Sequence, residues 1–322
     1  MRPIEVLYEH PHWFQPLFDE LQKRGVAHRL IHIDEHRYRP NAPRELATDH
    51  PLVFNRMSPS AWKRDRSSAI YYTAGYLKHL EALGVQVVNG ARCFQFETSK
   101  ASQLSLLSNL GLAAPKAIVV HQPKQLIEAA GDLVFPLIAK PNVGGSGAGI
   151  VRFDDKASLA AAVAEGRITG GLDGIWLLQE YHRPRGGHIV RVETLAGRYL
   201  YGIKVHLGDE GGFDLCPADI CRTPLGQQLD ATAACPVESV KKGLTVEGYT
   251  PPQEIVEAIE RIAKGTSLDV GGIEYLVSDR DGQTYFYDIN ALSNFVSDGP
   301  RVVGFNPFEK LVDELISRAR AS

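Results

Sequence analysis

The chain has 322 residues, of which 44% are hydrophobic and 23% charged, and its formal net charge is -3. This is the composition of a globular protein with about two or three domains, and it gives no basic field that would attract nucleic acid. No apolar run approaches the length of about 18 residues that a membrane-spanning helix needs, and charge and proline interrupt the N-terminal segment, unlike a signal peptide. We therefore expect a cytoplasmic protein that binds neither nucleic acid nor a membrane.

Strand and helix patterns alternate over the first 95 residues. Phe14, Leu17 and Leu21 recur at helical spacing, and Gly25 and Gly84 fit positions just beyond helix ends. The strands are predicted at residues 4–9, 27–34, 50–58 and 85–90, and the helices at 13–24 and 69–83. This order predicts a small parallel α/β domain.

The rest of the chain contains two further groups of elements. The first group is predicted as helix 99–111, strand 116–120, helix 123–131, strands 136–141 and 149–153, helix 155–166 and strand 175–181. From residue 188 onward the strands read as antiparallel, with a hairpin turn at Gly197. The remaining elements are strands within 188–207, a helix at 251–265, strands at 270–279 and 284–290, and a helix at 307–319.

Residues 210–250 show no clear helical or strand period in their hydrophobic residues and contain many Gly, Pro and Thr. A segment of this length inside a compact protein is usually a functional lid or is disordered. We expect a lid that closes over the site. The segment also contains Cys216, Cys221 and Cys235. We predict that these, like Cys93, are reduced thiols, because a reducing compartment disfavours disulfides and their spacing is not that of a standard zinc site.

A glycine-rich stretch, "AKPNVGGSGAGIV" at residues 139–151, predicts a phosphate-binding loop. A Walker loop would place its lysine after the glycines, whereas Lys140 precedes them. A dinucleotide fingerprint would require a glycine at Ile150 and a helix directly after it. What remains is a hairpin whose backbone N–H groups hold phosphates, with Lys140 as the neutralising charge.

Three oxygen-bearing side chains near the C-terminus predict a metal site. Asp288 and Asn290 are two residues apart on one strand, so both side chains point to the same face. Glu274 lies on the preceding strand and would sit beside them. Mg²⁺ prefers one or two carboxylates together with phosphate oxygens, so the set predicts a metal that bridges ATP phosphates.

The motifs together resemble those of the ATP-grasp superfamily. The resemblance rests on the loop after Lys140, on "WLLQEY" as a hinge strand, on "GGIEYLVSD" with "TYFYDIN" as the metal strands, and on the first-domain stretch "NRMSPS". Within the superfamily the chain is most similar to RimK-type and glutathione-synthetase-type carboxylate–amine ligases. The resemblance covers the whole chain and implies an α/β fold, with α+β character in the C-terminal part. It divides the chain into an N-terminal Rossmann-like domain (1–95), a central ATP-grasp subdomain (96–182) and a C-terminal subdomain with the metal site and lid (183–322).

The resemblance also implies a set of nucleotide-binding residues. His188 stands nearest to the family's ribose-binding acid, and Glu193 is an alternative. The family usually ends its metal motif with E-x-N, so Asp288 is a departure that is one methylene shorter. The implied nucleotide set is Lys100, Lys140, Gly144, Gly145, Ser146, Gly147, Gln179, Glu180, Tyr181 and His188.

The function that follows is ATP-dependent ligation of a carboxylate to an amine through an acyl phosphate, with Mg²⁺, or Mn²⁺ in its place, as the metal. Arg191, Lys204 and Arg222 are candidates for stabilising the transferred group, because cations suit its charge. Arg56 is the candidate for the substrate carboxylate. Each of these could instead be a solvated or paired surface charge.

Two other functions are compatible with the sequence: an ATP-grasp kinase and a non-catalytic nucleotide-binding module. The acid and the amine are not identified, and a free amino acid, a peptide and a protein tail all fit. The oligomeric state is also open, although a dimer would be in keeping with the family.

Overall fold

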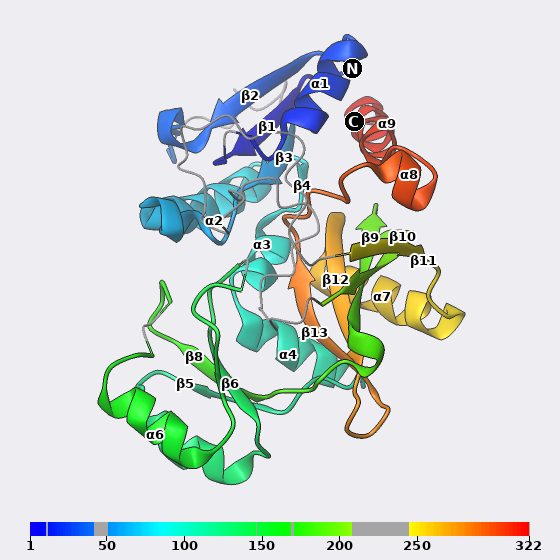
Figure 1. Ribbon diagram of the computed structural model, residues 1–322. Helices are drawn as coiled ribbons and strands as arrows, with labels where there is room; N and C mark the ends of the chain where they lie inside the picture. Colours follow the sequence, from blue (N-terminus) through cyan, green and yellow to red (C-terminus); the bar gives the residue numbers. More distant parts are fainter. Residues whose placement is uncertain (11, 42–50, 146, 169–170, 208–244, 322) are drawn as a thin grey trace.

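Three β-sheets form the framework of the described part of the chain (Figure 1). The structure is a computed structural model, and it describes residues 1–321 except 11, 42–50, 146, 169–170 and 208–244. None of the described helices is both long enough and apolar enough to span a membrane.

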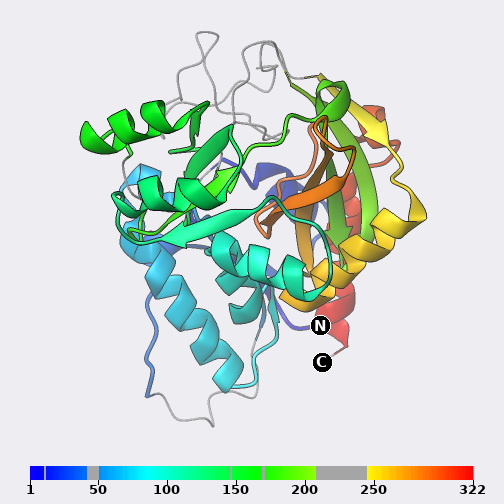
Figure 2. The ribbon, with the colours of Figure 1, turned by 90° about the horizontal axis from the view of Figure 1, so that it is seen from below.

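The first sheet is parallel, as the alternation of strands and helices predicted. Its order is β2-β1-β3-β4, formed by β1 (Ile4–Tyr8), β2 (His28–His32), β3 (Leu52–Arg56) and β4 (Val87–Val88). The apolar side chains of helix α1 (Gln15–Lys23) and those of helix α9 (Pro307–Arg320) share one core with β1 and β3. Helix α2 (Ser67–Ala82) belongs to a second core, which includes Leu7 and Val53. The two termini therefore lie close together, and Figures 1 and 2 show them side by side.

The second sheet is antiparallel and has the order β5-β8-β6-β7. Its strands are β5 (Ala117–Val120), β6 (Leu137–Pro141), β7 (Val151–Phe153) and β8 (Trp176–Glu180). Helices α5 (Gln125–Ala129) and α6 (Lys156–Ala164) pack on it and close its own hydrophobic core.

The third sheet has five antiparallel strands in the order β11-β10-β9-β12-β13. They are β9 (His188–Leu195), β10 (Arg198–His206), β11 (Thr245–Tyr249), β12 (Val270–Val277) and β13 (Thr284–Asn290). Helices α4 (Lys100–Asn109) and α7 (Gln253–Thr266) contribute to the core beside β9, β12 and β13.

Three elements differ from the sequence-based expectation. The end of the segment predicted as irregular forms β11, which pairs with β10 over five residues from Gly202 to His206. The strand was not predicted because a glycine and a charged residue interrupt its alternation of apolar and polar side chains. Helices α3 (Ala91–Glu97) and α8 (Gly299–Val303) were also not predicted, because each has only one or two turns and too few residues to show a period. The proposed lid, 208–244, lies outside the described residues.

Candidate functional site

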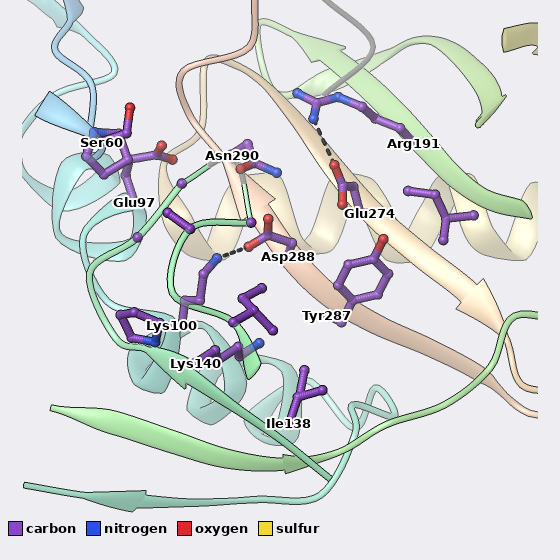
Figure 3. Close-up of a pocket in the computed structure, with 18 of the residues that line it drawn as sticks. Ser60, Glu97, Lys100, Ile138, Lys140, Arg191, Glu274, Tyr287, Asp288 and Asn290 are labelled. Atoms are coloured by element: carbon purple, nitrogen blue, oxygen red, sulfur yellow. Dashed lines mark hydrogen bonds and ion pairs between the residues drawn. The ribbon is translucent and has the colours of Figure 1, made fainter. Parts of the chain in front are cut away.

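A cavity between the second and third sheets brings most of the predicted site residues together (Figure 3). Its walls come from β6 and β8 on one side and from β9, β12 and β13 on the other. The loops after β1 and β3 close it with Trp13 and residues 58–60. The predicted residues that line it are Lys100, Lys140, Gly144, Gly145, Gly147, Gln179, Glu180, Tyr181, Arg191, Glu274, Asp288 and Asn290.

The glycine loop joins β6 to β7 as an antiparallel hairpin, as predicted. Gly147 and Gly149 have φ angles of +67° and +72°, which side chains rarely adopt. A Cβ atom on Gly149 would also lie 2.9 Å from the Pro141 ring, and one on Gly145 would lie 3.3 Å from Ser60 Cβ. The loop therefore needs glycine, and its tip packs against the loop that follows β3.

The two lysines enter the cavity from different elements, α4 and β6, and hydrogen bonds to Asn142 hold these elements together. Asn142, just beyond β6, accepts a hydrogen bond on its backbone carbonyl from Lys100 N at 3.2 Å and one on Oδ1 from Ala101 N at 3.0 Å. Ser99 caps α4 by accepting from Ser102 N at 3.2 Å. These contacts fix Lys100 at the first position of α4, close to Lys140 at the end of β6.

The two lysines have opposite pKa shifts. Burial, followed by the repulsion of Lys100, lowers the pKa of Lys140 to about 7, although Asp288 and Glu274 act the other way. Burial also lowers the pKa of Lys100, but the charge and hydrogen bond of Asp288 outweigh it, so the pKa of Lys100 rises. Lys140 is therefore the cation whose charge is poorly compensated within the protein, which suits it to a phosphate.

The acidic residues lie on paired strands, as expected. Glu274 on β12 stands opposite Asp288 on β13, and the register shifts directly after this pair. The extra residue of this bulge, Tyr287, lines the cavity next to Asp288, although neighbouring side chains on a regular strand point to opposite faces. Asn290 lies on the same face as Asp288 (Figure 3).

The charges of the two carboxylates are balanced by different cations. Burial raises the pKa of Glu274, and Arg191 opposes this rise while Asp288 adds to it. Burial also acts to raise the pKa of Asp288, but Lys100 and Lys140 outweigh it, so its pKa is lowered. Arg191 Nη1 donates to Glu274 Oε1 at 2.8 Å, and Lys100 Nζ donates to Asp288 Oδ1.

Strand β8 presents one unpaired acceptor and one fixed carboxylate, considering the described residues. Gln179 is 4% exposed, and its Oε1 has no hydrogen-bond partner among the residues that the structure describes. Glu180 accepts from Val134 N and from Arg280 Nη1, each at 3.1 Å. Arg280 also donates to the Tyr181 carbonyl at 3.3 Å. Because a buried acceptor without a partner is costly, Gln179 Oε1 is well placed to receive a donor from a ligand.

Several predicted residues do not line the cavity. Lys204 pairs with Glu247 at 3.2 Å and lies over the Tyr249 ring on β11. His188 contacts the Gly186 carbonyl at 3.2 Å at the start of β9. Ser146, Arg222 and the three cysteines 216, 221 and 235 lie outside the described residues.

Arg56 is buried beneath the cavity instead of lining it. Its guanidinium donates to the carbonyls of Ala291, at 3.3 Å, and Ser293, and it lies 4.9 Å from the centre of the Phe14 ring. Glu193, the alternative ribose ligand, is fully buried and accepts from Arg191 Nε at 2.6 Å.

Among the cavity residues that were not predicted from the sequence, Glu97 and Tyr287 have raised pKa values. Burial raises the pKa of Glu97 to about 7, although a hydrogen bond from Ala291 N lowers it. Burial also raises the pKa of Tyr287 well above its usual range. Glu97 lies at the end of the unpredicted helix α3, and Tyr287 is exposed to the cavity by a bulge, so no sequence period would have revealed either residue.

Comparisons with curated proteins give distant relatives. No family model matches the chain. It is 28% identical over 268 residues to a probable alpha-L-glutamate ligase of Pseudoalteromonas translucida, which covers 82% of this chain and 79% of that protein. It is 26% identical over 191 residues to the carbamoyl phosphate synthase large chain of Mesorhizobium japonicum, of which it spans only 16%. Against the probable alpha-L-glutamate ligase of Pseudomonas aeruginosa PAO1 it is 26% identical over 211 residues, covering 62% of this chain and 66% of that protein.

Solved structures match almost the whole chain. The ATP-grasp ligase PsnB in complex with a minimal precursor superposes with a TM-score of 0.67 at 20% identity, over 99% of this chain and 100% of PsnB. The D-alanine–D-alanine ligase of Bacillus anthracis gives a TM-score of 0.65 at 17% identity, over 100% and 98% of the two chains. The chain therefore has the ATP-grasp fold.

Proposed function

We propose that this protein is an ATP-dependent carboxylate–amine ligase. The observation that carries the proposal is that Lys100 and Lys140 face Glu274, Asp288 and Asn290 in one cavity (Figure 3), which the glycine loop also lines. Two cations and a set of backbone N–H groups suit a polyphosphate, and the oxygen side chains suit its metal.

The residues fit Mg²⁺, or Mn²⁺ in its place. Glu274, Asp288 and Asn290 offer oxygen donors from adjacent strands, and one of them is an amide, as magnesium sites with phosphate ligands allow. Among the described residues there is no cluster of three or more His, Cys, Asp and Glu side chains, so a metal here would depend on two carboxylates, one amide and the phosphate oxygens. When bound, the metal would neutralise the phosphates and align them for transfer.

The proposed reaction has two steps. A substrate carboxylate attacks the γ-phosphorus of ATP, the bond to the β-phosphate oxygen breaks, and an acyl phosphate and ADP result. An amine then attacks the acyl carbon, phosphate leaves, and the amine loses a proton to form the amide. Lys140 and Lys100 hold the phosphates, and Arg191 stands at the wall where the transferred group would pass.

The substrates would enter between the glycine loop and the first sheet, where Trp13, Ser58 and Ser60 line the cavity. In the first sheet β1 lies between β2 and β3, so the strand order reverses beside it. Ligands typically bind at such a reversal, beyond the carboxyl ends of the parallel strands. The relatives named glutamate ligases and the PsnB complex with a precursor favour an amino acid or a peptide as one substrate. We propose the cytoplasm as its location and keep the division at residues 95 and 182 as proposed domain boundaries.

The test is release of ADP and phosphate from Mg-ATP in the presence of amino acids and short peptides, with product masses recorded. ADP formation that needs two substrates, with a product mass equal to their sum less water, supports the ligase. One substrate that gains a phosphate would indicate a kinase instead. ATP binding without turnover by any pair would favour the binding module.

A further inference from the structure

The strand that carries Asp288 and Asn290 lies at the edge of its sheet. β13 pairs with β12 on one side only, so the backbone N–H and C=O groups on its other side need partners from elsewhere. Side chains from the first 103 residues provide these partners at Ile289 and Ala291, the two residues that flank Asn290.

Gln103 on α4 pairs with Ile289 in the manner of a neighbouring strand. Its Nε2 donates to the Ile289 carbonyl at 2.8 Å, and Ile289 N donates to its Oε1 at 3.2 Å. Nε2 also donates to the Phe96 carbonyl at 2.9 Å, so the amide plane is fixed at both ends. Gln103 is 2% exposed and does not line the cavity, so it acts on the site through the elements to which it bonds, β13 and the end of α3.

Ala291 is held in the same way by three other side chains. Glu97 accepts a hydrogen bond from its N–H, while Asn89 Nδ2 and Arg56 Nη1 donate to its carbonyl at 2.9 Å and 3.3 Å. Asn89 also bonds to the backbone of Val270 at the start of β12. Each of these side chains is at most 7% exposed.

We infer that Gln103 and Glu97, here called the edge clamp, are positioning residues that hold Asp288 and Asn290 in the geometry that binds the metal. This inference rests on the proposed function. The same short segment presents Lys100 to Asp288, so residues 97–103 fix both the cation and the strand that faces it. Groups that orient metal ligands through hydrogen bonds typically change metal affinity by about 10–100-fold when they are replaced.

The test uses ADP as the probe and measures its binding calorimetrically over a series of Mg²⁺ concentrations and in EDTA. Gln103→Met keeps the length of the side chain but removes both hydrogen bonds to Ile289. We expect the Mg²⁺ concentration for half-maximal enhancement of ADP binding to rise about tenfold, while ADP affinity in EDTA stays within about twofold of the wild type. Hydrogen exchange should become faster in β13 but not in α7.

Thr266→Val is the matched control. Thr266 is 1% exposed, does not line the cavity and donates to the Ile262 carbonyl within α7 at 2.9 Å, so the variant loses a buried hydrogen bond that does not involve β13. It should leave the Mg²⁺ dependence unchanged. If Gln103→Met does not fold, Gln103→Asn, which is shorter but keeps the amide, should shift the Mg²⁺ dependence in the same direction.

Two results would overturn the inference. One is a wild-type Mg²⁺ dependence in the Gln103 variant, and the other is an equal loss of ADP affinity with and without metal, which would indicate a general structural role. A wild-type protein whose ADP binding does not respond to Mg²⁺ would instead overturn the proposed metal site, and the inference with it. Asp288→Ala provides the reference for that outcome.

Discussion

Arg191 and Glu274 face each other across the β9–β12 ladder, with Arg191 Nη1 donating to Glu274 Oε1 at 2.8 Å. The same guanidinium donates to Glu193 at 2.6 Å and to Ser293 Oγ at 3.1 Å. One buried cation therefore compensates two buried carboxylates. Without a partner, either carboxylate would carry a large desolvation cost and take up a proton more readily.

Replacing Arg191 should make activity more sensitive to acid. Burial raises the pKa of Glu274 and Arg191 opposes that rise, so Arg191→Met should raise this pKa further. A protonated carboxyl binds metal poorly, and the low-pH limb of Mg-dependent ADP release should move to higher pH. The measurement is a pH profile of turnover from pH 6 to 9. Arg167→Met, at an exposed pair with Glu165, is the control. A loss of activity that is equal at every pH would contradict this explanation.

Nucleotide binding should take up a proton through Lys140. In the nucleotide-free protein the pKa of Lys140 is about 7, so the amine is largely neutral at pH 8. Bound phosphates favour the charged form, so its pKa rises and a proton is taken up at pH 8, whereas at pH 6 the amine is already charged and contributes no uptake. Calorimetric titration with ADP in buffers of different ionisation enthalpy measures the number of protons.

Lys140→Met separates this effect from that of Glu97, whose pKa is also about 7. The variant should bind ADP more weakly and lose most of the proton uptake at pH 8. Uptake that is unchanged in the variant would assign the proton to another group.

Gln179 should matter for nucleotide binding and little for folding. Its Oε1 has no partner within the described chain, so Gln179→Met removes a buried acceptor that costs free energy in the nucleotide-free state. We expect unfolding in urea to be unchanged or shifted to slightly higher concentration. ADP affinity should fall about fivefold, since a net hydrogen bond is worth about 1 kcal/mol. A loss of stability with unchanged ADP affinity would show that Gln179 is a structural residue.

The sequence was most informative where spacing alone determines geometry. Asp288 and Asn290 are two residues apart on one strand, so their spacing predicted that both side chains point to the same face. Lys140 ends a buried strand before glycines, which predicted a phosphate-binding lysine, and the chemistry of ATP together with the family resemblance joined it to the metal residues. The parallel order of the first sheet followed from its alternation of strands and helices in the same way. These features depend on contacts between residues that are close in sequence or on adjacent strands.

What the sequence did not indicate depends on contacts over long chain distances. Glu97 and Gln103 reach β13 across more than 180 residues, and a buried glutamine on a helix has the same local pattern as a solvated one. Tyr287 enters the cavity through a bulge, which has no signature in the alternation of β13. Lys204 was predicted from its position on a strand and His188 from the family resemblance, but neither of these tells which face of a strand lines the cavity. Lys204 instead pairs with a glutamate of the unpredicted strand β11.

Arg56 is either a substrate ligand or a structural cation, and a single substitution distinguishes the two roles. From the sequence we predicted that it binds a substrate carboxylate, whereas its guanidinium donates to the carbonyls of Ala291 and Ser293 and, at 3.2 Å, to Asn294 Oδ1. Burial lowers its pKa to about 10, so it still carries its charge at neutral pH. A lysine keeps the charge, but its single ammonium group cannot donate to all three acceptors that the planar guanidinium reaches.

Arg56→Lys should therefore lower the free energy of unfolding by about 1–3 kcal/mol, because it leaves buried carbonyls without donors. Urea denaturation measures this loss, and steady-state kinetics measure the KM of the carboxylate substrate once it is known. Since the guanidinium contacts the chain instead of the cavity, that KM should change by less than about twofold in the folded fraction. Arg2→Lys, at the partly buried hydrogen bond with Gln86, is the control for a change of Arg to Lys far from the site. A large rise in KM with unchanged stability would restore Arg56 as the substrate ligand.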